Sequence, residues 1–250
     1  AIGYGLPAVF NGDEPHHVDV AVSFGRGSLN TGVFKYPTLW MYVLFLLYAA
    51  GFILWSGAGL WRSPQAFGEL FVRDPAGFYL AGRLAATAFS LTGLWWVYRA
   101  GCLAGGRASG ALAAALIAVS PSLVELAHTA KPDSMMFSLA AWSWWQAMAY
   151  LSLGGGNRLF LCAAGVGLSI SSQYTAAPLA VLVPAAWQAR RLSRPGRGDG
   201  LVVLAAALAI VPLLFVAGSP FVLLDAPSFA RDLRDSWAAY GAGDGAAAGW

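Results

Sequence analysis

The sequence predicts an all-α membrane protein, a polytopic bundle of transmembrane helices. Of its 250 residues, 58% are hydrophobic and only 11% are charged, whereas about 25% of the residues in a soluble domain are charged. Apolar runs of about 20 residues, the length that crosses the hydrocarbon core of a bilayer, recur along the chain. The 11 tryptophans are typical of proteins whose aromatic side chains lie at membrane interfaces. The formal net charge of +3 is too small to indicate nucleic acid as a partner.

About six apolar runs are predicted to span the membrane. They are Phe78–Tyr98, Gly110–Ala127, Ser134–Leu153, Leu159–Ser172, Ala176–Ala189 and Leu201–Phe221. The fourth and fifth runs are short, so they could instead form a tight hairpin that does not fully cross twice. A further apolar run, Thr38–Ser56, is either another span or a helix at the membrane interface.

The positions of the arginines distinguish these two alternatives. If Thr38–Ser56 lies at the interface, the connections on one side of the membrane carry seven of the 15 Lys and Arg residues. These are Arg99, Arg107, Arg158, Arg190, Arg191, Arg194 and Arg197. Cytoplasmic loops carry such an excess of positive charge. We therefore expect an interfacial or re-entrant helix in the first outer loop, with its Trp40, Tyr42, Tyr48 and Trp55 at headgroup level.

This topology divides the chain into three parts. Residues 1–77 form a first outer loop with the interfacial helix 38–56, residues 78–223 form the bundle, and residues 224–250 form an outer segment. Ten of the 12 acidic residues lie in the parts expected outside, so carboxylate chemistry is expected on the outer face. The chain begins at Ala1 rather than Met, and we expect a helix before it and further residues after Trp250.

The segment 11–17 of the first outer loop concentrates ionisable groups. It places Asp13 beside Glu14, followed by His16 and His17. Adjacent carboxylates raise one another's pKa and favour a cation between them. A carboxylate in this position can act as a general base or as a metal ligand. The alternative is a solvated loop of ordinary turn residues.

A second polar segment, residues 128–133, connects two long apolar runs. It contains His128, Lys131 and Asp133. The structural alternative is that Asp133 serves as the N-cap of the helix that follows. Glu125 lies one turn before His128, inside an apolar run, and either faces the bundle interior as a functional group or reaches interfacial water.

Two cations are expected near the same outer surface. Arg83 lies near the outer end of the first span, and Lys35 comes shortly before the interfacial helix. The arginine either extends to the interface along its apolar stem or holds a lipid phosphate through two parallel hydrogen bonds.

The order of these features resembles the membrane glycosyltransferases of the GT-C fold, in particular the protein O-mannosyltransferase and aminoarabinose lipid A transferase superfamily. An outer-loop Asp-Glu is followed by Lys35-Tyr36-Pro37, by Phe78–Leu84 at the start of a helix, and by a Lys-Pro-Asp turn. Gln173-Tyr174 and the segment Ser219–Asp225 complete the series. The resemblance covers nearly the whole chain, as the N-terminal half of the catalytic membrane module.

The resemblance implies an inverting glycosyltransferase of the inner (plasma) membrane. Its donor is a sugar linked to a polyprenyl phosphate, and its acceptor is a hydroxyl of a protein, lipid or glycan on the outer face. It implies that Asp13 is the base, with Glu14 as its partner, and that Asp133 helps to bind a divalent cation, together with Asp13, or positions the donor phosphate. It assigns Lys35, Arg83, Lys131 and Tyr174 to that phosphate. Gln173 stands where the family commonly has lysine, which puts a phosphate role of this turn in doubt.

Two other classes of function stay open on the sequence alone. A transporter or lipid flippase would use Glu125, His128 and Asp133 as a proton or substrate path. It would also need charged residues deep in several spans, and Ser134–Leu153 and Leu201–Phe221 have none. A non-catalytic membrane scaffold would fit the departure at Gln173, whereas the intact carboxylates argue against it.

Overall fold

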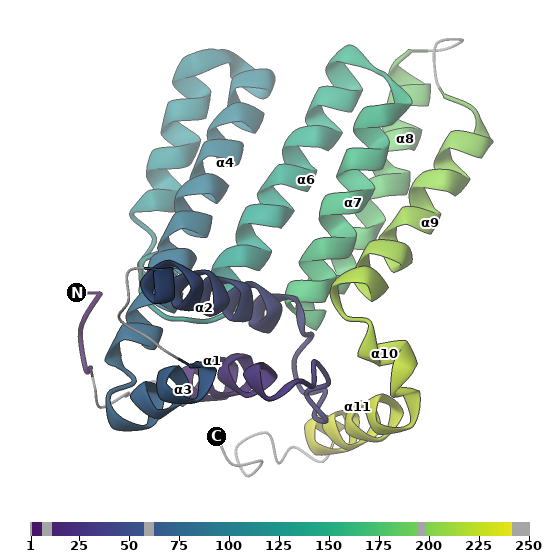
Figure 1. The fold of residues 1–250 in the computed structure, drawn as a ribbon. Helices are drawn as coiled ribbons and strands as arrows, with labels where there is room; N and C mark the ends of the chain where they lie inside the picture. Colours follow the sequence, from purple (N-terminus) through teal and green to yellow (C-terminus); the bar gives the residue numbers. More distant parts are fainter. Residues whose placement is uncertain (1, 7–11, 58–62, 195–198, 242–250) are drawn as a thin grey trace.

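The computed structural model describes residues 2–6, 12–57, 63–194 and 199–241, and these are arranged as helices without strands (Figure 1). The helices at the N-terminal side are α1 (Asp13–Ser23), η1 (Phe24–Arg26), α2 (Leu39–Gly57), α3 (Pro64–Arg73), α4 (Ala76–Ala118) and α5 (Pro121–Ala127). They are followed by α6 (Asp133–Leu153), α7 (Gly156–Ser172), η2 (Tyr174–Val181), α8 (Leu182–Ser193), α9 (Leu201–Gly218), α10 (Phe221–Leu224) and α11 (Ala226–Gly241). The predicted all-α class is confirmed.

The element labelled α4 consists of two helical arms that form a hairpin. The backbone leaves helical geometry at Gly105 and Gly106, and the positive φ of 83° at Gly106 is a conformation that favours glycine. A Cβ on Gly101 would lie 2.7 Å from the Cα of Gly110, so the arms touch backbone to backbone. The two arms, with α5 continuing the second, correspond to the first two predicted spans.

The remaining predicted spans correspond to helices that lie side by side with α4 (Figure 1). The third and fourth are α6 and α7, and the sixth is α9. The fifth run begins as the 3₁₀ helix η2, which contains Pro178, and continues as α8. By length and hydropathy, α2, α4 and α9 are the helices of the described chain that qualify as membrane spans. The number of about six crossings stays a prediction.

Helix α2 runs across one end of the bundle instead of alongside it, which agrees with the expected interfacial helix (Figure 1). Helices α1 and α3 lie on the side of α2 that faces away from the bundle. We call this end, with α1, α2, α3 and α11, the capped end. Trp40 and Tyr48 of α2 are buried, and their polar atoms donate to backbone carbonyls of the segment 128–131 and of α4. The headgroup level expected for the α2 aromatics stays a prediction.

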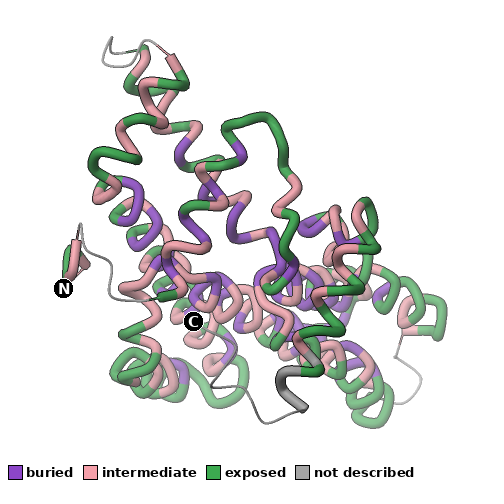
Figure 2. The backbone as a smooth tube through the Cα atoms, turned by 90° about the horizontal axis from the view of Figure 1, so that it is seen from below, coloured by how far each residue is buried: buried purple, intermediate pink, exposed green. Residues whose placement is uncertain are grey.

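Buried residues concentrate where the helices meet (Figure 2). One core cluster joins α6, α7, α8 and α9, and includes Tyr150, Leu159 and Val166. A second cluster joins α1, α2, α4 and α6, and includes Trp40 and Leu44. The second core fixes the capped end to the bundle and thereby positions the first turn of α1.

The connections that carry the arginines lie at the end of the bundle opposite the capped end (Figure 1). Arg99 lies over the rings of Trp95 and Trp145, and Arg190 donates to the carbonyls of Tyr150 and Leu151 at the end of α6. Arg197 lies outside the described residues. This separation agrees with the predicted sidedness of the loops, and the membrane face that each end occupies stays a prediction.

The segment after the bundle returns to the capped end as α11 (Figure 1). Just before it, Asp225 accepts a hydrogen bond from the side chain of Asn30 at 2.9 Å. On α11, Asp232 accepts one from the backbone amide of Phe34 at 2.7 Å. Two carboxylates therefore fix the segment 28–36, which leads into α2.

Candidate functional site

The first turn of α1 holds both acidic residues of the first outer loop. Asp13 and Glu14 are its first two residues, and carboxylates there are favoured by the positive end of the helix dipole. The Oδ2 atom of Asp13 forms an ion pair with Nζ of Lys131 at 3.0 Å. The hydroxyl of Tyr36 donates to Oδ1 of Asp13 at 3.3 Å. The fold therefore brings together the two polar segments that sequence analysis singled out.

The surroundings of Asp13 keep its carboxylate ionised. Partial burial alone would raise the pKa of Asp13, but the Lys131 ammonium and the Tyr36 hydroxyl outweigh that effect. The net result is a pKa below the ordinary value of 3.8. The Asp13 side chain is 20% exposed. An ionised, partly accessible carboxylate can receive a proton from a bound hydroxyl.

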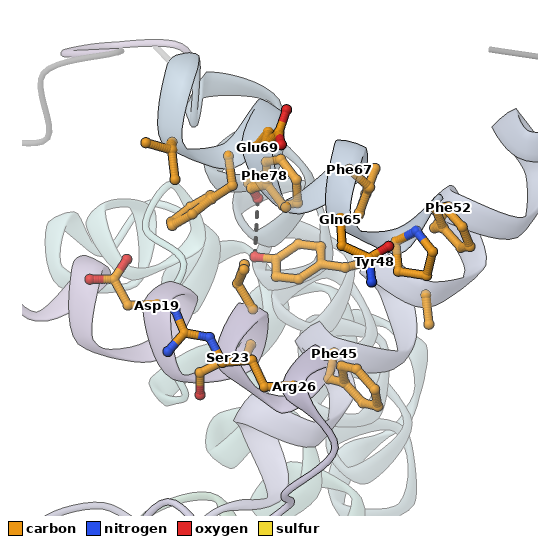
Figure 3. A pocket seen from close by; sticks show the side chains of 18 residues that line it. Asp19, Ser23, Arg26, Phe45, Tyr48, Phe52, Gln65, Phe67, Glu69 and Phe78 are labelled. Atoms are coloured by element: carbon orange, nitrogen blue, oxygen red, sulfur yellow. Dashed lines mark hydrogen bonds between the residues drawn. The ribbon is translucent and has the colours of Figure 1, made fainter. Parts of the chain in front are cut away.

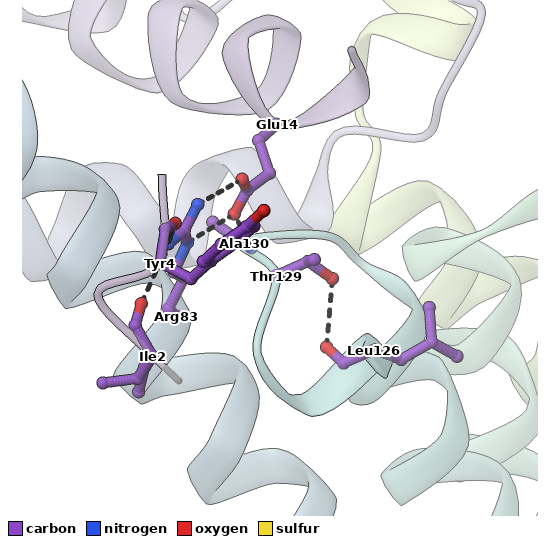
Figure 4. Close-up of polar contacts among 7 residues, drawn as sticks. All are labelled: Ile2, Tyr4, Glu14, Arg83, Leu126, Thr129 and Ala130. Atoms are coloured by element: carbon purple, nitrogen blue, oxygen red, sulfur yellow. Dashed lines mark hydrogen bonds and ion pairs between the residues drawn. The ribbon is translucent and has the colours of Figure 1, made fainter. Parts of the chain in front are cut away.

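Glu14 is fully buried and points toward Arg83 and Ala130 (Figure 4). Its two oxygens accept hydrogen bonds from Nε and Nη2 of Arg83 at 2.9 and 2.7 Å. Oε1 also accepts from the backbone amide of Ala130 at 2.6 Å. The Nη1 atom of Arg83 donates to the carbonyls of Ile2 and Tyr4, both at 2.8 Å. All these partners belong to the protein, so a role of Arg83 at the donor phosphate stays a prediction.

Ala130 is the point at which the segment 128–131 is fixed. Its carbonyl accepts a hydrogen bond from the indole of Trp40 at 3.0 Å, while its amide donates to Glu14. A Cβ added to Gly82 would lie 2.8 Å from the Cβ of Ala130, so only glycine permits this approach of α4. Sequence reasoning missed Trp40 and Gly82 as supports of Lys131. The Gly82-Arg83 pair near the start of α4 was the sequence feature that could have indicated this support.

Asp133 forms the second acidic position of the site. It is the first residue of α6 and makes no capping bond to the helix backbone, so the N-cap alternative is wrong. Its Oδ1 atom accepts a hydrogen bond from Nε2 of Gln173 at 3.1 Å. Within the described part of the chain, its Oδ2 atom is buried and has no hydrogen-bond partner. Gln173, which stands where the family commonly has lysine, thus contacts Asp133, the acid that the resemblance assigns to a cation or to the donor phosphate.

The two histidines pack against Tyr36 behind the Asp13 carboxylate. The ring centroids of His17 and Tyr36 are 4.7 Å apart, and those of His16 and Tyr36 are 5.5 Å apart. Burial lowers the pKa of His17 from 6.5 to about 3, with a further contribution from His16. Burial also lowers the pKa of His16. Both imidazoles are therefore neutral at physiological pH and help to shape the surroundings of Asp13.

Of three other predicted residues, Glu125 and His128 lie apart from these contacts, and Lys35 lies beside Tyr36. Glu125 is exposed on α5 and does not face the bundle interior. His128 bonds through Nδ1 to the carbonyl of Val124 at 2.6 Å. The Lys35 ammonium lies 5.8 Å from the centre of the Tyr36 ring. The assignment of Lys35 to the donor phosphate stays a prediction.

Comparison with protein families identifies the bundle. The profile of the dolichyl-phosphate-mannose-protein mannosyltransferase family matches residues 78–220, which is more than half of the chain. The chain belongs to this mannosyltransferase family. No curated protein and no solved structure matches it. The matched region includes Lys131, Asp133 and Gln173 and begins after Asp13 and Glu14.

Membership of the mannosyltransferase family fixes the broad activity. The protein is a multi-pass membrane glycosyltransferase that takes its sugar from a polyprenyl-phosphate donor. This finding favours the transferase over the transporter and scaffold alternatives.

Few side chains suited to a divalent cation come together in the part of the chain that the structure describes. Among the described residues, no three His, Cys, Asp or Glu side chains form a group suited to a metal ion. Asp13 is engaged by Lys131 and Tyr36, whereas Asp133 has one oxygen without a protein partner in the described chain. A cation held by Asp13 and Asp133 stays a prediction.

The capped end also contains a cavity of about 820 Å³ between α1, α2, α3 and the start of α4 (Figure 3). Its walls are mainly apolar and include six aromatic side chains, and the hydroxyl of Tyr48 bonds to the carbonyl of Phe78. These aromatic residues are Phe45, Tyr48, Phe52, Phe67, Phe71 and Phe78. Asp19, Arg26 and Glu69 add charged groups to the lining. The cavity lies beside α2, between α1 and α3.

Proposed function

We propose that this family member transfers the sugar to a hydroxyl acceptor on the outer face of the plasma membrane, with inversion, and that Asp13 is the base. The observation that carries the proposal is the contact of the Asp13 carboxylate with Lys131 and Tyr36. It combines a proton acceptor with a cation at the end of the bundle that is opposite the arginine-bearing connections.

The proposed step is a direct displacement. The acceptor hydroxyl gives its proton to Asp13 as its oxygen bonds to the anomeric carbon of the donor. The bond from that carbon to the phosphate oxygen breaks, and the polyprenyl phosphate leaves with the electron pair. Attack opposite the leaving group inverts the configuration. Positioned general-base catalysis contributes roughly 10²–10⁴-fold to the rate of such a step.

Lys131 has two roles in this proposal. Its ammonium keeps Asp13 ionised, and it supplies a positive charge close to the phosphate on which negative charge develops. Fixed donors aimed at developing charge are typically worth about 3–4 kcal/mol in the transition state. Lys35 and Tyr174 are the other groups proposed for the phosphate.

Glu14 is proposed as a positioning residue. Its oxygens are buried and bond to Arg83 and Ala130. It therefore acts through the placement of α1 and of the segment that carries Lys131. Asp13, the more accessible of the two acids, is left to meet the acceptor.

The test is the Asp13→Asn variant in membranes that contain a polyprenyl-phosphate sugar donor. We expect sugar transfer to fall by roughly 10²-fold or more while expression and donor binding are retained. Asp235→Asn, an exposed change on α11, is the matched control and should keep full activity. Wild-type activity in Asp13→Asn would refute the assignment of the base. Anomeric analysis of the product by NMR tests inversion.

A further inference from the structure

Two buried acceptor atoms come together where α6 begins and α7 ends. Gln173 donates through Nε2 to Oδ1 of Asp133 at 3.1 Å. The remaining acceptor atom of each side chain, Oδ2 of Asp133 and Oε1 of Gln173, is shielded from solvent. Among the residues that the structure describes, neither oxygen has a hydrogen-bond partner. Because each belongs to a group engaged in the same hydrogen bond, the two acceptors are neighbours.

The orientation of the Gln173 amide follows from chemistry. An ionised carboxylate can only accept hydrogen bonds, so the NH₂ group of Gln173 must face Asp133. The carbonyl oxygen of Gln173 is then left as an acceptor beside Oδ2. Buried polar atoms without partners are costly, and each one in a folded protein calls for an explanation. A ligand that donates hydrogen bonds would satisfy both atoms.

The charge of the pair excludes a phosphate as that ligand. A phosphate diester offers only acceptors, and the pair presents two acceptors and a carboxylate but no cation. The nearest positive charge in sequence, Lys131, is bonded to Asp13. Neighbouring hydroxyl groups of a sugar ring have the required donors.

The pair is also connected to the proposed base. Asp133 follows Lys131 by two residues, and Lys131 contacts Asp13. We propose that Asp133 and Gln173 form the subsite for the sugar ring of the donor and accept hydrogen bonds from its hydroxyl groups. This inference rests on the proposed function. It makes Gln173 a residue that determines which sugar is used.

The experiment measures binding of two lipids to the purified full chain in detergent. One is a polyprenyl phosphate, and the other is the same lipid carrying a hexose. We expect the wild type to bind the hexose-linked lipid more tightly than the sugar-free lipid. Gln173→Leu should reduce that preference about tenfold, because one lost hydrogen bond costs this much at the upper end of the usual range. Affinity for the sugar-free lipid should change less than about twofold, because the phosphate does not touch the pair.

Gln173→Lys keeps a donor for Asp133 but replaces the acceptor with a cation. It should lose preference for the hexose while its affinity for the sugar-free lipid stays within about twofold of the wild type. Retained binding of the sugar-free lipid cannot come from a misfolded protein. Gln188→Leu, an exposed change on α8, is the matched control and should behave as the wild type.

The outcomes separate the subsite from the proposed function. Equal binding of both lipids by the wild type, or an unchanged preference in Gln173→Leu, would overturn the sugar subsite and leave donor binding intact. A preference that EDTA removes and Mg²⁺ restores would assign Asp133 to a cation instead and would also overturn it. A wild type that binds neither lipid would refute the proposed function itself.

Discussion

Glu14 and Arg83, which are 69 positions apart in the sequence, form a buried ion pair through two parallel hydrogen bonds. Glu14 is fully buried and Arg83 is 5% exposed. The planar guanidinium matches the carboxylate in this geometry, which lysine cannot reproduce. Because Glu14 also bonds to Ala130, the pair joins α1, α4 and the segment that carries Lys131. The neighbouring Asp13 is thereby placed beside Lys131.

Removing one partner of this pair should destabilise the protein strongly. Arg83→Met would leave the Glu14 carboxylate buried without its charge partner, and such changes cost about 3–5 kcal/mol. Thermal unfolding in detergent, followed by tryptophan fluorescence, measures the loss. The exposed Arg73→Met is the control and should stay close to the wild type. Adding Glu14→Met to Arg83→Met should recover part of the stability, and a double variant less stable than the single one would contradict the buried-pair explanation.

Loss of the Lys131 charge should shift the pH dependence of transfer. The Lys131 ammonium lowers the pKa of Asp13, so Lys131→Met raises that pKa. The proposed base works only when ionised, and the acidic limb of kcat/KM should therefore move to higher pH. Arg26→Met removes a cation from the same end of the protein and serves as the control. If the Lys131→Met profile falls uniformly without a shift, Lys131 does not set the pKa of Asp13.

Burial of His17 should make stability depend on pH. Its pKa is about 3 in the folded protein, against 6.5 as the ordinary value, so the unfolded state binds more protons between these limits. Stability should then fall by about 1.4 kcal/mol per pH unit as pH drops below 6.5. His17→Phe removes this contribution, and His16 titrates in both proteins. Melting temperatures from pH 7 to pH 5 should diverge, whereas parallel curves would contradict the assignment.

The helical bundle could be predicted because apolar runs of about 20 residues report directly on the membrane, whereas the orientation inferred from the arginine positions stays a prediction. The same argument separated Thr38–Ser56 from the bundle, and α2 does run across its end. The pairing of Asp13 with Lys131 could be predicted from the sequence only in part. Sequence placed both on one face, and the contact itself depends on how α1 packs against α2 and α4.

The residues that support the site from other helices could not be predicted from the sequence. Trp40 was expected at headgroup level because interfacial tryptophans are common, yet its indole bonds to a buried carbonyl 90 positions away. Arg83 was expected to meet lipid phosphate or solvent, and its contact with Glu14 depends on tertiary packing. Local patterns identify a charged side chain, and they do not identify which charge it meets across the fold.

The close approach of α4 to the segment 128–131 supplies the last prediction. Gly82→Ala would place a Cβ 2.8 Å from the Cβ of Ala130 and 3.3 Å from Cδ2 of Leu44. Such overpacking costs about 1–3 kcal/mol and displaces one of the two surfaces. Because Lys131 follows Ala130, we expect transfer to fall together with the melting temperature.

Gly77→Ala, in the first turn of the same helix, is the matched control. A Cβ there meets no atom within 4 Å, and alanine is the better helix former by up to about 1 kcal/mol. This variant should keep its activity and its stability or gain slightly in stability. Gly82→Ala with wild-type activity and melting temperature would show that the segment moves freely. In that case the hydrogen bonds of Ala130 to Glu14 and Trp40 would not hold Lys131 beside Asp13, since the segment could move without loss.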